Sequence, residues 1–265
     1  MKKFPLLLCF FLVSCSKFDK NISNFSDNNI ISEDIIIEDF GNIINDYEYY
    51  ALNFYKINDL IIPDIVYADL YIYNNHTTKT KVEVLEDYKN GTKYHVKNKD
   101  IDLWVNASRL EFNYEDNNYP LSALSFFENE IYVNYQKFSS DTNYFVWVDL
   151  KRQVVNIFLK LNDYLFQIKS IKCASGKMTT PTKRGFFTII SKGPVFYNEE
   201  KYYKCYYWAK FSDNYLFHSL PYSYDEMLLT STLQKKVSHG CIRMTYQDAK
   251  WFYDNIPLNT AVWIN

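Results

Sequence analysis

The sequence of 265 residues is poor in several features, and each absence excludes a class of protein. Its formal net charge is only −2, which gives no electrostatic reason to expect nucleic acid or a strongly charged membrane surface as a partner. It has only 4 histidines, and His76 and His95 stand in no metal-ligand spacing. Only 6 glycines accompany 25 tyrosines and 20 phenylalanines, which favours a mainly β fold over a helical bundle. A bias toward Asn, Ile, Lys and Tyr along the whole chain explains the same counts equally well.

The chain begins with an apolar stretch that is too short to span a bilayer. Lys2 and Lys3 precede this stretch, residues 5–13, and a positive start followed by a short apolar run is typical of a signal peptide. The stretch ends in Leu12-Val13-Ser14-Cys15, which resembles the lipobox of bacterial lipoproteins. We therefore expect a lipoprotein signal peptide over residues 1–14 and a lipid on Cys15, which makes the protein an exported, membrane-anchored lipoprotein facing the periplasm or cell wall. The alternative is an ordinary secretory leader in which Cys15 is incidental.

Export sets the redox context of the remaining cysteines. Cys9 leaves with the leader and Cys15 carries lipid, so Cys173, Cys205 and Cys241 remain in the exported chain. An odd number in an oxidising compartment predicts one thiol that is reactive or buried. Cys173 and Cys205 either form a disulfide or are two buried reduced thiols, and the sequence leaves both possibilities open.

Changes in composition divide the exported chain into segments. Residues 15–29 are rich in Asn, Ser and Asp and read as a tether, and residues 30–60 predict a short helical lead-in. Short strand-like runs separated by turn signals follow over residues 61–112, and a connector covers residues 113–143. A second β-rich unit occupies residues 144–265.

The first β-rich unit is predicted to be a small β-barrel-like domain. Its sequence, with the turn Lys89-Asn90-Gly91 before one strand and Trp104 at the start of another, resembles a bacterial Src-homology-3-type domain. Such domains often bind wall polymers or peptides, so the resemblance implies that polymer binding, rather than chemistry, depends on this unit. Trp104 and Tyr94 are either ligand-facing or part of its core.

The second unit predicts several strands and one helix. Residues 145–177 read as three strands joined by a charged turn and by Asn162-Asp163, and strand-like sequence continues through GFFTII and KYYKCYYWAKF. Thr245 stands three residues before Asp248 in a pattern typical of a capping box, and apolar residues at helical spacing then run to Ile256.

The segment with most chemical information is Ser238-His239-Gly240-Cys241-Ile242-Arg243. A nucleophilic thiol needs a base or cation that favours the thiolate, and backbone N–H groups aimed at the oxyanion that it creates. Gly240 permits a close backbone approach that a Cβ would block. We therefore expect the pKa of Cys241 to lie below the roughly 8.5 of a free thiol. A histidine-glycine-cysteine tripeptide alone would be weak evidence, because cysteine is commonly a small buried residue.

The surrounding residues make the case much more specific. SHGCIRM, the upstream FHSL, the segment TTPTKRGFF, the run YFVWVDLKRQVVNIF and the terminal LNTAVWIN stand in the order seen in the L,D-transpeptidase family (YkuD-type catalytic domain). The resemblance covers residues 144–265. It implies that Cys241 is the nucleophile, that His218 is its base, oriented by the Ser219 carbonyl, and that His239 lines the site. The remaining positions that match are supporting ones: the Gly240 and Cys241 amides as oxyanion donors, Ser238 and Arg243 around the thiol, and Pro181 and Gly185 in the preceding hairpin.

The resemblance also implies a fold and a reaction. The fold is a mostly antiparallel β-sandwich with a short helix after the catalytic cysteine. Cys241 attacks the tetrapeptide stem of peptidoglycan, releases the terminal D-Ala and holds a thioester, and an amine of another stem then forms a 3-3 cross-link, with no metal or cofactor. Carbapenems are expected to inhibit such a thiol.

Three other outcomes remain open at this point. The thioester could be discharged by water, as in an L,D-carboxypeptidase, or by a protein amine, which would attach a protein to the wall. A non-catalytic wall-binding lipoprotein that keeps the fold is the alternative from another class. The sequence departs from the family pattern in two places: 19 residues separate His218 from Ser238, and no glycine stands just before Ser238. Both departures lie in the expected lid and affect substrate preference.

Overall fold

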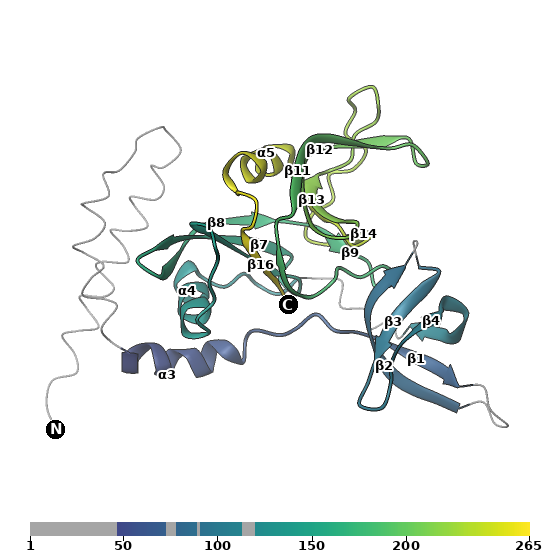
Figure 1. Cartoon of the computed structure of the whole chain (residues 1–265), viewed down its shortest axis with the longest axis horizontal. Helices are drawn as coiled ribbons and strands as arrows, with labels where there is room; N and C mark the ends of the chain where they lie inside the picture. The colour runs from purple at the N-terminus through teal and green to yellow at the C-terminus, as the bar shows by residue number, and fades with distance from the viewer. Residues whose placement is uncertain (1–46, 73–77, 89–90, 113–119) are drawn as a thin grey trace, which may run out of the picture. The chain divides into compact units, whose positions relative to one another are not determined.

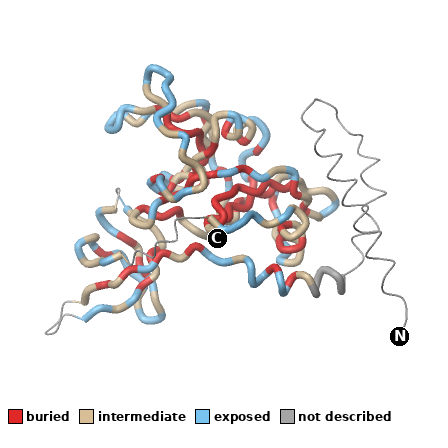
Figure 2. The backbone as a smooth tube through the Cα atoms, turned by 180° about the vertical axis from the view of Figure 1, so that it is seen from behind, coloured by how far each residue is buried: buried red, intermediate tan, exposed pale blue. Residues whose placement is uncertain are grey.

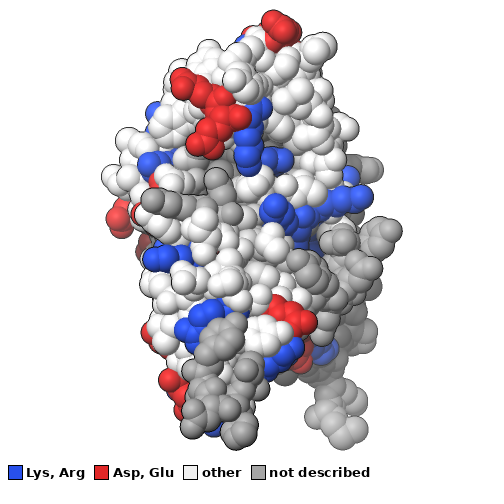
Figure 3. Space-filling model, turned by 90° about the vertical axis from the view of Figure 1, so that its right-hand side faces the viewer, with Lys and Arg blue, Asp and Glu red and all other residues white. Residues whose placement is uncertain are grey.

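The computed structural model describes residues 47–72, 78–88, 91–112 and 120–265 (Figure 1). The predicted signal peptide, Cys9, Cys15, the tether and residues 30–46 of the helical lead-in lie outside the described residues, as do His76 and Asn90. None of the described helices is long and apolar enough to cross a membrane. Tyr50–Asn265 form one compact unit. On the face shown in Figure 3, basic and acidic side chains are interspersed, in keeping with the small net charge.

An antiparallel sheet of five strands, here called the N-terminal sheet, follows the first helix in the order β4-β3-β2-β1-β5. Its strands are β1 (Val66–Ile72), β2 (Thr78–Tyr88), β3 (Lys93–Lys97), β4 (Asp102–Asn106) and β5 (Leu110–Phe112), with a short helix η1 (Ala107–Arg109) before the last. Val82 and Val84 in the middle of β2 and Tyr94 and Val96 in β3 are buried at alternate positions, and they join one small core. The strand predictions for residues 61–112 therefore hold, whereas the Src-homology-3 resemblance stays a prediction.

The two aromatic residues singled out in this sheet lie in different environments. Tyr94 is 3% exposed and belongs to the core, whereas Trp104 is 46% exposed and stacks on His95 with 5.3 Å between ring centroids. His95 also forms a 2.7 Å contact with Asp102. Of the two, only Trp104 is therefore available to a ligand.

Two of the described α-helices come before the C-terminal sheets in the sequence. The helical lead-in is observed as α3 (Tyr47–Asn58) within the described residues, and α4 (Phe126–Tyr135) lies in the segment expected to be a connector. Ser125 caps α4 by accepting a hydrogen bond from the Glu128 N–H at 3.2 Å, while the Ser125 N–H donates to the Glu128 carboxylate at 2.8 Å. This capping box is readable as Ser-x-x-Glu in the sequence, so α4 could have been predicted from it.

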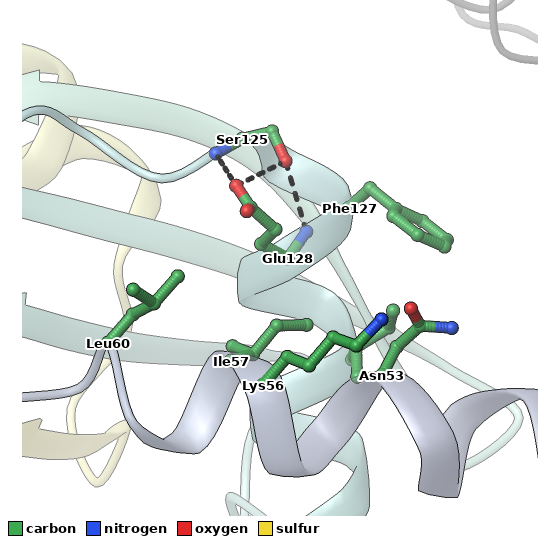
Figure 4. A pocket seen from close by; sticks show the side chains of 8 residues that line it. Asn53, Lys56, Ile57, Leu60, Ser125, Phe127 and Glu128 are labelled. Carbon is green, nitrogen blue, oxygen red and sulfur yellow. Dashed lines mark hydrogen bonds between the residues drawn. The ribbon is translucent and has the colours of Figure 1, made fainter.

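A pocket of about 390 Å³ lies between α3 and the start of α4 (Figure 4). Ile57 of α3 and Leu60 just after it line one side, and Phe127 and Glu128 of α4 with its N-cap Ser125 line the other. Its lining includes none of the candidate site residues.

The C-terminal half is built from two larger sheets and a short two-stranded one. The first sheet has the order β10-β16-β6-β7-β8 and the second the order β11-β12-β13-β15, while β14 pairs with β9. The strands are β6 (Tyr144–Asp149), β7 (Val154–Leu161), β8 (Tyr164–Lys172), β9 (Ser175–Gly176), β10 (Gly185–Thr188), β11 (Ser191–Asn198), β12 (Tyr203–Ser212), β13 (Tyr215–Ser219), β14 (Lys236–Ser238), β15 (Ile242–Met244) and β16 (Ala261–Ile264).

Strand β6 shows why a strand of these sheets can be an almost continuous run of apolar residues. Val146 and Val148 belong to the core shared with the second sheet, whereas Phe145 and Trp147 pack on the opposite side with residues of α3 and α4. Since successive side chains of a strand point to opposite faces, both faces of this sheet are covered. The result is the sandwich-like, mainly β fold that was predicted. In space, many of the buried stretches lie close to the C-terminus (Figure 2).

The predicted helix after the cysteine is α5 (Tyr246–Asn255), which lies against β12 and β13 (Figure 1). Thr245 is its N-cap and accepts a hydrogen bond from the Asp248 N–H at 3.0 Å. Ala249, Phe252 and Ile256 bury into the core between the sheets. This helix fixes the chain that leaves β15.

Strand pairing is less uniform than the prediction of a mostly antiparallel sandwich conveys. β16 pairs with β6, β13 with β15 and β9 with β14 in parallel, while the other named pairs are antiparallel. The parallel pairs join segments distant in sequence, which local turn signals do not specify. Cys173 and Cys205 are both buried free thiols, so they do not form the disulfide that the sequence left open.

Candidate active site

The pairing of β13 with β15 brings the predicted nucleophile and base together. The two strands are parallel, with His218 opposite Arg243. Paired residues of parallel strands point to the same face, and side chains along one strand alternate between faces. Cys241 immediately precedes β15 (Ile242–Met244) and stands two positions before Arg243, so continuing the alternation by one residue puts Cys241 on the same face as His218.

His218 is buried as a neutral base. Its side chain is 2% exposed, and Nδ1 lies 2.6 Å from the Ser219 carbonyl oxygen. A carbonyl can only accept, so Nδ1 carries the proton and Nε2 keeps its lone pair. The pKa of His218 is lowered from 6.5 to about 3, chiefly by burial and to a smaller extent by the charge of Arg243, while the Ser219 hydrogen bond opposes the shift. The imidazole is therefore unprotonated at neutral pH.

The Cys241 thiol does not have the low pKa that the sequence led us to expect. Burial raises its pKa, and this effect outweighs a backbone hydrogen bond from Leu216 and the charge of Arg243, which both lower it. The thiol is half-buried, and Sγ donates to the Asn214 carbonyl oxygen at 3.6 Å. Cys241 is thus held as a neutral thiol beside a neutral histidine.

The loop before Cys241 is fixed by its own hydrogen bonds. Ser238 Oγ donates to the Cys241 carbonyl at 2.6 Å, and the Gly240 N–H donates to Ser238 Oγ at 3.1 Å. Gly240 has a φ of +98°, and an added Cβ would lie 2.4 Å from the Tyr215 ring, so glycine is required here. The Gly240 amide is already used, and its expected role as an oxyanion donor requires its bond to Ser238 to break.

Two threonines that sequence reasoning missed also hold this loop. Thr180 Oγ1 donates to the Ser238 carbonyl at 3.1 Å, and Thr182 Oγ1 donates to the Gly240 carbonyl at 2.8 Å. Both side chains are buried. They flank Pro181, which the sequence did single out, and the paired threonines of Thr-Pro-Thr were the available signal.

Cationic groups lie close to His239, the second histidine of the motif. His239 is exposed, and its Nε2 lies 3.2 Å from Lys201 Nζ. The pKa of His239 is lowered by partial burial first and then by the charges of Lys201, Lys177 and Arg243. Within the described part of the chain, Arg243 Nε is a buried nitrogen with no hydrogen-bond partner. A guanidinium placed in this way can donate hydrogen bonds to an anionic group and bind it.

Among the described residues, no group of three or more His, Cys, Asp or Glu side chains could hold a metal ion. The arrangement is a thiol, a neutral imidazole on the same face of the strand pair, a loop of constrained amides and the Arg243 guanidinium. These parts are suited to acyl transfer through a thioester.

Comparison with known proteins agrees with this chemistry. Residues 143–264 match the model of the family described as the L,D-transpeptidase catalytic domain. The putative L,D-transpeptidase YciB of Bacillus subtilis (strain 168) is 33% identical over 128 residues, which make up 45% of this chain and 66% of the relative. Residues 143–264 therefore belong to the L,D-transpeptidase catalytic-domain family.

Two solved structures are similar to part of this chain. One is a fused Zn-dependent amidase/peptidase/peptidoglycan-binding domain-containing protein of Clostridium acetobutylicum, which is 35% identical with a TM-score of 0.41 and covers 48% of this chain and 53% of its own. Another is an L,D-transpeptidase of Stackebrandtia nassauensis, which is 19% identical with a TM-score of 0.39 over 48% of this chain and 58% of its own. This chain thus spans little more than half of either structure.

Proposed function

We propose that this protein is a peptidoglycan L,D-transpeptidase that forms 3-3 cross-links through a thioester on Cys241. The observation that carries the proposal is the placement of Cys241 and a buried neutral His218 on one face of the β13–β15 pair, within an L,D-transpeptidase catalytic domain. A neutral thiol and a neutral imidazole can form the reactive pair by transferring one proton as the thiol attacks.

The first half-reaction releases D-Ala from the donor stem. Cys241 Sγ turns from the Asn214 carbonyl toward the substrate and attacks the carbonyl before the terminal D-Ala, while His218 Nε2 takes the thiol proton. The C–N bond then breaks, His218 returns the proton to the departing D-Ala amine, and the acyl group stays on sulfur as a thioester. In this proposal the Cys241 amide stabilises the oxyanion, and the Gly240 amide joins it once its hydrogen bond to Ser238 breaks.

The second half-reaction transfers the acyl group to an acceptor. The side-chain amine of the third residue of another stem attacks the thioester, gives its proton to His218, and displaces the thiol, which recovers that proton. Arg243, whose buried Nε has no hydrogen-bond partner among the residues that the structure describes, supports recognition of a stem carboxylate. Water or a protein amine as acceptor would give the carboxypeptidase or the wall-attaching activity on the same thioester.

Incubation of the purified protein with tetrapeptide-rich peptidoglycan tests the reaction. We expect mass spectrometry of the muropeptides to show new 3-3 dimers together with free D-Ala. Tripeptide stems without dimers would identify water as the acceptor, and a stem joined to a protein amine would identify wall attachment. Unchanged muropeptides with a folded protein would contradict all three activities and leave a non-catalytic wall-binding protein.

We also propose that the protein is a lipoprotein anchored through Cys15. The support is the order of a basic start, a short apolar run and Leu12-Val13-Ser14-Cys15. In cells fed a clickable fatty acid, we expect the label on the wild-type protein and none on Cys15→Ala. Cys9→Ala is the matched control and should keep the label, because residue 9 leaves with the leader. Equal labelling of the wild type and Cys15→Ala would remove the anchor.

A further inference from the structure

Residues 177–184, here called the bridging segment, connect β9 to β10 and contact the N-terminal sheet on one side. Met178 packs against the core of that sheet, and the Thr179 carbonyl accepts a hydrogen bond from Tyr94 Oη at 2.7 Å. Tyr94 is itself 3% exposed and lies in β3, so its hydroxyl is presented from a fixed ring. These contacts lie within the compact unit formed by Tyr50–Asn265.

Ion pairs join the same two parts at the end of the bridging segment. Lys183 Nζ lies 2.9 Å from Glu86 Oε2, and Arg184 forms an ion pair with Glu83. Both glutamates belong to β2, and all four side chains are only partly exposed. Pairs of this kind contribute more than fully exposed ones because solvent screens them less.

The other side of the bridging segment holds the loop before Cys241, residues 238–240. Between the residues that contact the N-terminal sheet stand Thr180 and Thr182, whose hydroxyls donate to the Ser238 and Gly240 carbonyls. The Gly240 carbonyl belongs to the peptide unit whose N–H is that of Cys241. A shift of Thr182 would therefore tilt the amide that is proposed to face the oxyanion.

Tyr215 provides a second connection between the same parts. Burial and the side-chain charges of Asp87 and Glu86 raise the pKa of the Tyr215 hydroxyl. A backbone hydrogen bond from Asp87 of β2 to the same hydroxyl lowers this pKa. Its ring lies against Gly240, where an added Cβ would come within 2.4 Å. Tyr215 immediately follows Asn214, whose carbonyl holds the Cys241 thiol.

We propose that the N-terminal sheet is a positioning element of the active site, in which Tyr94, Glu83 and Glu86 fix the bridging segment and, through it, the Cys241 amide. This differs from the sequence-based interpretation, in which that sheet serves polymer binding alone. The proposal rests on the proposed function only in taking Cys241 as the nucleophile. Tyr94 touches no reacting atom and acts through Thr179 and its neighbours.

The test compares two reactions of Cys241 in Tyr94→Phe, which removes one hydroxyl and keeps the ring. Acylation by a carbapenem develops an oxyanion and needs the positioned amide, whereas alkylation by iodoacetamide does not. We expect the acylation rate of the full chain to fall about three- to tenfold, with the alkylation rate nearly unchanged. Tyr71→Phe is the matched control, because that hydroxyl donates to Glu111 within the N-terminal sheet and should leave the ratio of the two rates at the wild-type value.

A second pair of variants covers the case in which Tyr94→Phe does not fold. Glu83→Gln with Glu86→Gln should lower the same ratio, and Glu111→Gln, which loses an ion pair to Lys79, should not. An unchanged ratio in both test variants, or acylation and alkylation falling equally, would overturn the positioning role. If the wild type is not acylated at all, the proposed function fails instead. Hydrogen exchange of the amides of residues 236–241 then decides the positioning role, with faster exchange in Tyr94→Phe than in Tyr71→Phe expected and equal exchange contradicting it.

Discussion

Replacing Cys241 with alanine is expected to abolish both the carbapenem adduct and every change in the muropeptides while leaving the protein folded. The wild type should gain the full mass of one carbapenem, because opening of the lactam ring by the thiol expels no fragment. The thiol is half-buried, and its removal should cost at most about 1 kcal/mol of stability. Intact-mass spectrometry measures the adduct, and thermal unfolding checks the fold.

The matched control is Cys173→Ala, because Cys173 is also a free cysteine but is fully buried. Burial raises the pKa of the Cys173 thiol, so it should contribute no adduct in the wild type. This variant should therefore retain the complete mass shift. An adduct that persists in Cys241→Ala, or that disappears in a folded Cys173→Ala protein, would show that the acylated residue had been misassigned.

Elements whose signals are local could be predicted from the sequence. Asn162 and Asp163 both adopt positive φ, 47° and 65°, in the turn between β7 and β8, as expected for two such residues between apolar runs. Thr245 caps α5 as its spacing to Asp248 predicts. The helix α4 had an equally local signal at Ser125 and Glu128, but it stood in a segment interpreted as a connector.

Features that depend on tertiary packing could not be predicted in this way. The parallel pairing of β13 with β15 joins residues 217–219 to residues 242–244 across the lid, and no turn chemistry encodes it. The motif predicts Cys241 as nucleophile and His218 as base, but the direction of the Cys241 pKa shift follows from burial, which is set by neighbours distant in sequence. The roles of Thr180 and Tyr94 likewise appear only when the bridging segment is seen between two other parts of the fold.

Loss of the His218 imidazole is expected to slow acylation of Cys241 by about two to four orders of magnitude, the usual effect of losing a general base. The variant is His218→Gln, and its pH dependence distinguishes the base from a structural histidine. Protonation would disable Nε2, and burial lowers the pKa of His218 to about 3, so the wild-type rate should stay nearly constant from about pH 7 to about pH 5 and fall only at lower pH.

Without His218 the thiol must ionise unaided, so its own titration should control the rate. Burial raises the pKa of Cys241, and the His218→Gln rate should therefore rise about tenfold per pH unit through the neutral range and beyond about pH 9. Intact-mass measurement of the carbapenem adduct against time gives both profiles, and His95→Gln, in the N-terminal sheet, should keep the flat wild-type profile. A wild-type rate that halves near the ordinary histidine pKa of 6.5, or a His218→Gln rate within about fivefold of the wild type, would show that His218 does not accept the thiol proton.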